Sequence, residues 1–300
     1  MLVSSADEGS LSAAARKLKI PVATLTRNVN NLETLVGIKL LVRTTRKLAF
    51  TDAGLEYVAA ARRILEDVSE LERRAVGEFT SPRGELVVSS PVQVARLRVL
   101  PVINQFLDLY PEIRIRLLQS DRIIDLVDMH ADVAIRVGHL CDSSLVAKRV
   151  GSLRVVMVAS PALLDKYGWP KTPEDLRDFP CVVFDSPSLS PWRYRSQDNG
   201  QIHAVNVLPR LLVSSPDAAV DAAINGIGIT SVLEHDVHEA VKAGKLKYIL
   251  QHFEVEPIPV HVIFLSRDAM PAKLRHFIDY AVPQLRELLA EFGRTPVEMQ

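Results

Sequence analysis

Apolar and polar positions in the first fifty residues follow helical spacing first and strand-like spacing afterwards. Residues 10–18 hold a run of alanines after Ser10 and basic residues at their end, which predicts a short helix capped by Ser10. After a short turn, Pro21 suits the start of a second helix, and helical spacing continues through residues 22–35. Residues 40–51 place β-branched and aromatic side chains around a polar, basic centre and predict a small hairpin.

The next segment, residues 52–80, predicts one long helix, because no proline interrupts it before its end and Gly54 is the only glycine before Gly77. Its apolar residues recur at intervals of three and four, which suits pairing with a second helix and predicts a dimerising arm. An amphipathic helix that lies on its own domain is the alternative. The apolar positions are Val58, Ala61, Leu65, Val68, Leu71, Ala75 and Phe79.

Residues 80–84, TSPRG, break the pattern and mark the best domain boundary. Strands and helices alternate beyond it, which predicts α/β lobes built on mainly parallel sheets with helices on both faces. We expect two lobes, residues 84–160 plus 263–300 and residues 161–262, with a small-molecule cleft between them. The expected strands include 85–90, 113–118, 132–137 and 260–265, and the expected helices include 91–110, 123–129 and 272–292.

Charge is unevenly distributed along a chain whose net charge is zero. Residues 1–51 contain eight Lys and Arg against three acids, whereas residues 52–80 contain four basic and seven acidic residues. A basic head on a neutral body predicts an anionic partner for the head alone.

The second predicted helix carries a polar face that suits the major groove of DNA. On a helical wheel, Val22, Leu25, Val29 and Leu32 fall on one side, and Arg27 lies at the centre of the other. Arginine can pair with guanine or phosphate, asparagine with adenine, and a threonine methyl can touch thymine. An ordinary solvated helix face is the alternative, but the preceding helix and turn complete a helix-turn-helix. The candidate base-reading residues are Thr24, Thr26, Arg27, Asn30 and Asn31.

The basic hairpin follows this helix directly and is expected to form a wing that contacts phosphates or the minor groove. Its candidate DNA-binding residues are Arg43, Thr45 and Arg46. Residues 1–51 therefore predict a winged helix-turn-helix domain that binds double-stranded DNA.

The chain resembles LysR-type transcriptional regulators in two sets of segments. GSLSAAARKL and TLTRNVNNLETLVGIKLLVRTTRKLAFTDAG are similar to the N-terminal domain of that family. DVAIRVGHLCDSSLVAKRVG and ASPALLDKYGWPKTPEDL resemble its effector-binding domain, particularly in the CrgA-like branch. The resemblance implies a winged helix-turn-helix, a long linker helix that pairs in dimers, and a two-lobed α/β effector domain like periplasmic binding proteins. It also implies a homodimer or homotetramer that regulates promoters in response to a small-molecule effector.

Two features depart from the family pattern. Pro21, Val22 and Ala23 stand where most members have Ser-Gln-Pro, so we expect the helix to read DNA with its middle more than with its tip. Residues 1–8 allow only a short first helix, and the sequence leaves open whether the start codon lies upstream.

Two strand-to-helix junctions share the tripeptide Ser-Ser-Pro, at residues 89–91 and 214–216. Serine before proline is typical of a helix N-cap, where free backbone N–H groups attract anions. Simple capping is the alternative, and the family resemblance favours effector contact at Ser90, Pro91, Ser215 and Pro216. Arg136, near the end of a strand, could hold a carboxylate of an acidic effector or form a structural ion pair.

Other classes of function find little support in the sequence. No HExxH, HxxxH or GxSxG motif is present, so an enzyme is improbable. His235 and His238 could share a helix face, but no third metal ligand accompanies them and we expect surface residues. Cys141 could sense redox state, yet a plain loop thiol is the simpler interpretation. We expect no metal, no cofactor, no membrane span and a cytoplasmic protein.

Overall fold

The computed structural model describes residues 1–43, 48–75, 82–121, 131–140, 145–185, 189–265 and 270–293. The chain divides into two compact units, Met1–Ser81 and Pro82–Gln300. Among the described residues, no helix is both long enough and apolar enough to cross a lipid bilayer.

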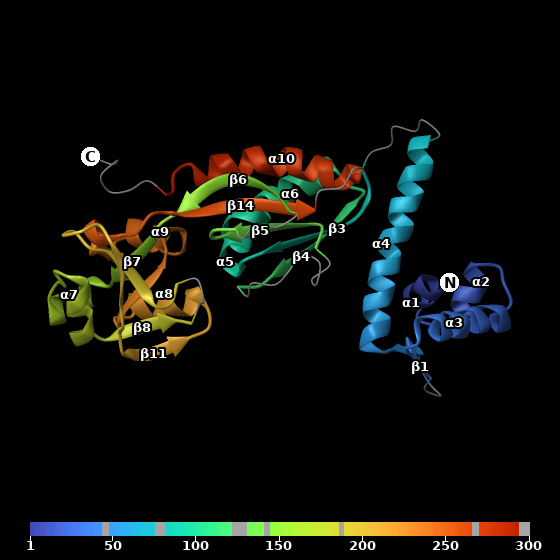
Figure 1. Ribbon diagram of the computed structural model, residues 1–300, viewed down its shortest axis with the longest axis horizontal. Coiled ribbons are helices and arrows are strands. Elements are labelled where there is room, and N and C mark those ends of the chain that lie inside the picture. The colour runs from blue at the N-terminus through green and yellow to red at the C-terminus, as the bar shows by residue number, and fades with distance from the viewer. Residues whose placement is uncertain are drawn as a thin grey trace. The chain divides into compact units, whose positions relative to one another are not determined.

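The first unit is a winged helix-turn-helix followed by a long helix, as the sequence predicts (Figure 1). The Ser10 hydroxyl accepts a hydrogen bond from the Ala13 N–H at 3.4 Å, which confirms the expected N-cap. Pro21 is itself the N-cap of the next helix, one residue before its first helical position. The elements are α1 (Leu2–Glu8), α2 (Leu11–Lys17), α3 (Val22–Val36), β1 (Leu41–Arg43), β2 (Leu48–Phe50) and α4 (Asp52–Ala75).

Helix α4 packs against the core of its own unit near its start, and apolar residues further along the helix are exposed. Val58 is buried in the core that also contains Leu25, Val29 and Leu40. A side chain at Gly54 would collide with the Leu40 carbonyl oxygen, so glycine allows α4 to pack against the chain before β1. The alternative interpretation of α4 therefore holds for its first turns. Farther along, Ile64, Leu65 and Val68 are exposed, and Leu71, Ala75 and Phe79 lie outside the described side chains.

The second unit contains two α/β lobes. The sheet of lobe I has the strand order β4-β3-β5-β14-β6, and α6 and α10 pack on one face of it (Figure 1). Its core includes Phe106 from α6 and Phe277 from α10. The expected helix at residues 123–129 lies outside the described residues. The elements are β3 (Gly84–Ser90), α5 (Val92–Val94), the π-helical turn η1 (Ala95–Val99), α6 (Leu100–Leu109), β4 (Ile113–Gln119), β5 (Val133–Val137), β6 (Leu145–Leu153), β14 (Ile258–Leu265) and α10 (Ala272–Leu289).

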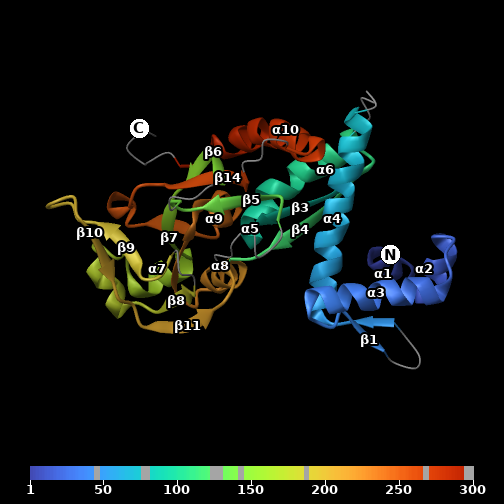
Figure 2. The ribbon, with the colours of Figure 1, turned by 45° about the vertical axis from the view of Figure 1, so that its right-hand side comes forward.

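Lobe II repeats this plan with the strand order β11-β8-β12-β7-β13. Alternate residues of β7 enter different clusters, Val156 and Val158 on one face and Met157 on the other, as the two-residue period of a strand requires. Figure 2 shows the β9–β10 hairpin projecting from this lobe. The elements are β7 (Val155–Ala159), α7 (Pro161–Tyr167), η2 (Pro173–Asp178), β8 (Cys181–Phe184), β9 (Trp192–Arg195), β10 (Ile202–Val205), β11 (Pro209–Val213), α8 (Pro216–Ile224), β12 (Ile229–Leu233), α9 (Glu234–Lys242), β13 (Lys247–Ile249) and η3 (Gln251–Phe253).

The sheets are mixed rather than mainly parallel. In lobe I, β3 is parallel to β4 and β5, but β14 is antiparallel to β5 and β6. In lobe II, β8 is parallel to β11 and β12, but β7 is antiparallel to β12 and β13. The antiparallel pairs involve β7 and β14, the strands that directly follow the two passages of the chain between the lobes. β6 leads into β7 at the first passage, and the chain returns from lobe II into β14 at the second. The passages lie at Arg154 and residues 254–257, a few residues from the lobe limits expected from sequence.

Candidate functional site

The outward face of α3 carries most of the residues expected to read DNA. Arg27, Asn30 and Asn31 are exposed, and Thr24 and Thr26 are half-buried at the sides. Val22 differs from the helical wheel, because it is 42% exposed and does not join the apolar side. Val22 lies in the first turn of α3, on the same side as Leu25 and Val29, but the core does not extend far enough to cover it. Arginine and asparagine side chains thus lie together on one exposed helix face.

A buried carboxylate, which sequence reasoning missed, joins α3 to the wing. The Glu33 side chain accepts hydrogen bonds from the backbone N–H groups of Leu40 and Leu41, at 2.9 and 3.0 Å, and pairs with Lys39 at 2.6 Å. Burial alone would raise the pKa of this carboxyl, but Lys39 and the two N–H groups outweigh it and lower the pKa. The signal in the sequence is a glutamate four residues after Val29, on the apolar stripe. In Figure 2, β1 accordingly runs beside α3.

The wing is described only at its strands. β1 and β2 pair antiparallel, with Leu41 opposite Phe50 and Arg43 opposite Leu48. Arg43 therefore stands at the end of β1, whereas Thr45 and Arg46 lie outside the described residues.

An open cleft lies between the two lobes, and its empty volume of about 680 Å³ includes space that is open to solvent. Lobe I contributes Pro91 and Arg136, and lobe II contributes Pro216, so three of the five expected effector residues line it together. Arg136 extends from the end of β5 and donates a hydrogen bond to the Ser89 hydroxyl at 3.5 Å. Burial lowers the pKa of this guanidinium below its ordinary value. Apolar side chains make up much of the remaining wall, including Val94, Val137, Phe184, Leu189, Leu233 and Ile258.

The two Ser-Ser-Pro junctions fold differently, and neither Ser90 nor Ser215 is a lining residue of this cleft. Ser215 caps α8 as expected, by accepting a hydrogen bond from the Ala218 N–H at 3.3 Å. Ser90 does not cap its helix. It is fully buried at the end of β3 and donates to the Pro91 carbonyl, while Pro91 occupies the N-cap position. Asp121 replaces it as the acceptor for the Val92 N–H, at 3.1 Å.

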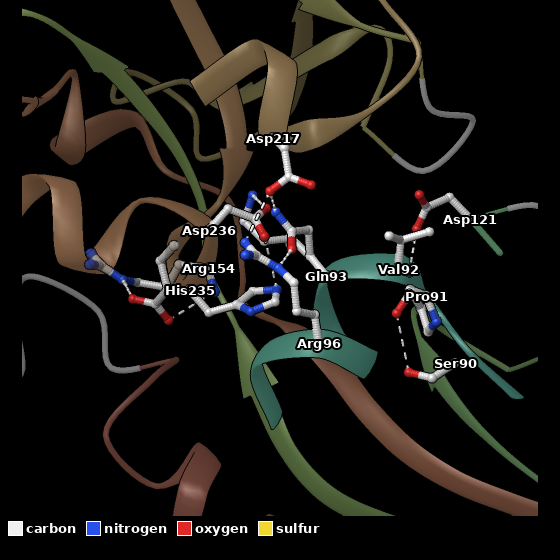
Figure 3. Close-up of polar contacts among 12 residues, drawn as sticks. Ser90, Pro91, Val92, Gln93, Arg96, Asp121, Arg154, Asp217, His235 and Asp236 are labelled. Carbon is white, nitrogen blue, oxygen red and sulfur yellow. Dashed lines mark hydrogen bonds and ion pairs between the residues drawn. The ribbon is translucent and has the colours of Figure 1, made fainter. Parts of the chain in front are cut away.

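A polar clasp joins the two lobes between Gln93 and Arg96 of lobe I and Asp217 of lobe II (Figure 3). The Gln93 amide and the Arg96 guanidinium both donate to one oxygen of Asp217, the latter at 3.0 Å. Arg96 also donates to the Gln93 side-chain oxygen at 2.8 Å. Arg96 and Asp217 are about half-exposed, so water competes for this clasp. Sequence reasoning had no signal for it, because its partners stand 124 residues apart.

Two family models match the chain, a bacterial regulatory helix-turn-helix of the lysR family over residues 1–55 and a LysR substrate-binding domain over residues 80–286. The chain belongs to the LysR family of transcriptional regulators. The regulator CrgA of Neisseria meningitidis is 31% identical over 95% of each chain. A transcriptional repressor of Pseudomonas aeruginosa is 32% identical over 95% of this chain and 89% of its own. The solved structure of CrgA matches with a TM-score of 0.62 at 30% identity, covering 94% of this chain and 96% of that one.

This membership makes the chain a LysR-type transcriptional regulator with an effector-binding domain, and not an enzyme, since its relatives are named as regulators. The resemblance seen in the sequence is confirmed, as is the fold of helix-turn-helix, linker helix and two-lobed effector domain.

In this LysR-type regulator, a buried ion cluster holds the two passages between the lobes. Arg154, on the first passage, donates to Glu234 at 2.7 Å and to Glu254, on the second passage, at 3.1 Å. All three side chains are more than nine-tenths buried. Glu234 also accepts hydrogen bonds from the backbone N–H groups of Arg154 and Gly293, the latter just after α10. The cluster therefore connects both passages and both lobes.

His235 is buried, contrary to the surface position expected from sequence. It follows Glu234 at the start of α9, and burial together with the nearby Arg98 guanidinium lowers its pKa to about 3. His238, one turn later, is 38% exposed. Among the described residues, no three histidine, cysteine or acidic side chains group as metal ligands. The missed signal is Glu-His-Asp directly after a buried strand, where α/β folds place ligand contacts. Cys141 lies outside the described residues.

Proposed function

We propose that this chain binds operator DNA sequence-specifically through α3 and the wing, and that a small acidic effector bound between the lobes tunes this activity in the bacterial cytoplasm. The observation that carries the proposal is the exposed face of Arg27, Asn30 and Asn31 on a helix anchored to the wing by Glu33. Such side chains suit base edges, and fixing α3 against the wing lets both contact one DNA segment. The proposed DNA contacts are Thr24, Thr26, Arg27, Asn30, Asn31, Arg43, Thr45 and Arg46.

Arg136 supports an acidic effector. It is a half-buried guanidinium on the wall of a largely apolar cleft, where a carboxylate would find a bidentate partner away from bulk water. Pro91 and Pro216 are proposed to contact the body of the same molecule, whereas Ser90 and Ser215 remain predictions as ligand contacts. A ligand held by both lobes would bias their relative position, and through it the paired DNA-binding units.

The exposed apolar residues of α4 support self-association. Ile64, Leu65 and Val68 lie within two turns and are 45–63% exposed. We propose that they pair with the same residues of a second copy, giving a homodimer as the unit of a dimer or tetramer.

Footprinting on the intergenic DNA upstream of the gene tests DNA reading. We expect protection of a defined inverted repeat, and uniform coverage would contradict sequence-specific reading. Arg27→Ala should lower affinity for the repeat by roughly ten- to hundredfold and remove its advantage over random DNA. Val22→Ala should change little. Arg275→Ala is the matched control, because it removes one exposed positive charge from α10 in the second unit.

Titration with acids identified from neighbouring metabolic genes tests the cleft. For an acid that binds the wild type, Arg136→Ala should lower the affinity by roughly tenfold or more. Undiminished affinity would remove Arg136 from the site.

Sedimentation at micromolar concentration tests self-association. We expect the wild type to sediment as a dimer and the double variant Leu65→Lys with Val68→Glu to shift toward monomer. A monomeric wild type would contradict the dimer proposal.

A further inference from the structure

His235 and Asp236, at the start of α9, form a second polar wall of the interlobe cleft (Figure 3). Their side chains are 0% and 2% exposed. Both ring nitrogens of His235 and the Oδ1 oxygen of Asp236 form no hydrogen bond among the described residues, although His235 Nε2 and Asp236 Oδ1 lie 3.4 Å from each other. The Asp236 Oδ2 oxygen, in contrast, accepts a hydrogen bond from the Leu233 N–H at 3.2 Å. Oδ2 of Asp236 is thus hydrogen-bonded to the backbone at the start of α9, whereas Oδ1 is not hydrogen-bonded.

Unpartnered polar atoms at such a depth are costly. A buried donor or acceptor left without a partner costs about 1–3 kcal/mol, so native proteins rarely keep several together without a reason. Here three such atoms belong to adjacent residues that line a cleft. A ligand that enters the cleft and supplies matching groups would recover this cost, whereas an apolar ligand would not.

The wall is uncharged at neutral pH. The pKa of Asp236 is raised to about 8, chiefly by burial and also by the nearby Asp217 and Asp121 carboxylates, while the Leu233 N–H and Arg96 lower it in part. Burial and Arg98 lower the pKa of His235 to about 3. Asp236 therefore presents a carboxylic O–H donor, and His235 presents one ring N–H and one lone pair.

A hydroxyl group complements this wall because it both donates and accepts one hydrogen bond. An ammonium group fits less well, since it would lose water against a neutral acid and a neutral imidazole that already have Arg96 and Arg98 close by. On lobe I, Arg136 presents a positive charge that suits a carboxylate, in contrast to the neutral wall of His235 and Asp236. Apolar residues such as Val137, Phe184 and Leu233 complete the lining.

We infer that the cleft selects an apolar-bodied carboxylic acid that also carries a hydroxyl group, with the hydroxyl held by His235 and Asp236. The carboxylate half rests on the proposed function, in which Arg136 binds the acid. The hydroxyl half stands on the buried, unpartnered atoms of α9, so the two halves can succeed or fail separately.

Four kinds of probe separate the two halves when titrated into the full chain by ligand-observed NMR and calorimetry. Benzoate carries the acid alone, benzyl alcohol the hydroxyl alone, and 3- and 4-(hydroxymethyl)benzoate carry both at two spacings. 4-(Aminomethyl)benzoate replaces the hydroxyl with a cation. We expect the better hydroxymethyl acid to bind roughly tenfold more tightly than benzoate, the gain of one or two net hydrogen bonds.

Substitutions then assign the gain to its residues. Asp236→Ala should reduce the tenfold gain to roughly onefold, whereas Asp236→Asn, which keeps a donor and an acceptor of similar shape, should retain most of it. Benzoate should lose affinity with Arg136→Ala and keep it with Asp236→Ala. Matching circular dichroism and melting curves would show that the Asp236 variants remain folded, and Asp236→Asn supplies the test if the alanine variant does not.

The outcomes separate the inference from the proposed function. Arg136-dependent binding of benzoate without a hydroxyl gain would overturn the inference alone. Asp236-dependent binding of benzyl alcohol without any binding of benzoate would support the hydroxyl half of the inference and contradict its carboxylate half together with the acidic effector. A gain that persists in Asp236→Ala, a preference for the aminomethyl acid, or no binding of any probe at millimolar concentration would each overturn the inference.

Discussion

Two sets of polar contacts join the lobes, and they differ in nearly every physical respect. The cluster of Arg154, Glu234 and Glu254 is buried at the passages of the chain, with ion-pair distances of 2.7 and 3.1 Å. The clasp of Gln93, Arg96 and Asp217 joins the lobes near the surface and is about half-exposed at Arg96 and Asp217. Breaking one partner of a buried cluster leaves a charge without compensation, whereas water replaces an exposed partner easily. We call the first set the pivot, because it lies at both passages, and we expect it to contribute more to stability than the clasp does.

Removing the arginine of the pivot should produce the largest effect. Arg154→Ala leaves two buried carboxylates without their cation and should lower the free energy of unfolding by about 3–5 kcal/mol. Denaturant titration of the full chain measures this. Arg195→Ala is the matched control, because it removes an exposed ion pair with Glu256 and should cost about 0–1 kcal/mol. Equal losses in the two variants would contradict a stabilising role for the buried pivot beyond that of an exposed ion pair.

The free energy of unfolding should depend on pH through Asp236, which lines the cleft. Its pKa of about 8 in the folded chain lies above the ordinary value near 3.9, so the folded state holds the proton more tightly. The stability from this group is fully present below the unfolded pKa and is lost as pH rises through 8. Between pH 6.5 and 8.5, the wild type should lose more than about 1 kcal/mol relative to Asp236→Asn, because both proteins contain His235 and its titration cancels in the comparison. Parallel stability curves for the two proteins would exclude this assignment.

The N-cap beneath the clasp should have an intermediate effect. Ser215→Ala removes the acceptor for the Ala218 N–H at the start of α8, which carries Asp217 in its first turn. We expect a loss of about 1 kcal/mol in the free energy of unfolding. Ser214→Ala, at the exposed neighbouring position, should change stability by less than about 0.5 kcal/mol.

Opening the clasp itself should change stability least and mobility most. Asp217→Asn weakens its contacts with Gln93 and Arg96 and should cost less than about 1 kcal/mol. Amide hydrogen exchange at α5 and the first turn of α8 should nevertheless become faster. Asp221→Asn makes the same charge change one turn later, at an exposed position, and should leave exchange unchanged. An unaltered exchange rate in Asp217→Asn would show that the clasp does not hold the lobes together.

Secondary structure was accessible from the sequence wherever it depends on neighbouring residues. The Ser10 cap, the helix after Pro21 and the β1–β2 strands each follow from a few adjacent side chains, and the structure contains all of them. The wheel of α3 placed its polar face correctly but buried Val22, because a wheel has no information on where the core ends. The Ser-Ser-Pro repeat predicted one cap correctly and one wrongly, since Asp121 from another loop supplies the acceptor at the first junction.

The sequence by itself determined the elements of the DNA-binding unit, the two-lobed effector domain and the family, because local spacing and contiguous motifs carry that information. Only the tertiary structure decided which side chains meet in the cleft and at the pivot. Gln93 and Asp217 are 124 residues apart, and Arg154 and Glu254 are 100 apart. Their contacts depend on how two lobes pack across two passages of the chain, and neither residue type nor local period encodes that packing. The same packing buries His235 and Asp236 and places both residues on the wall of the cleft.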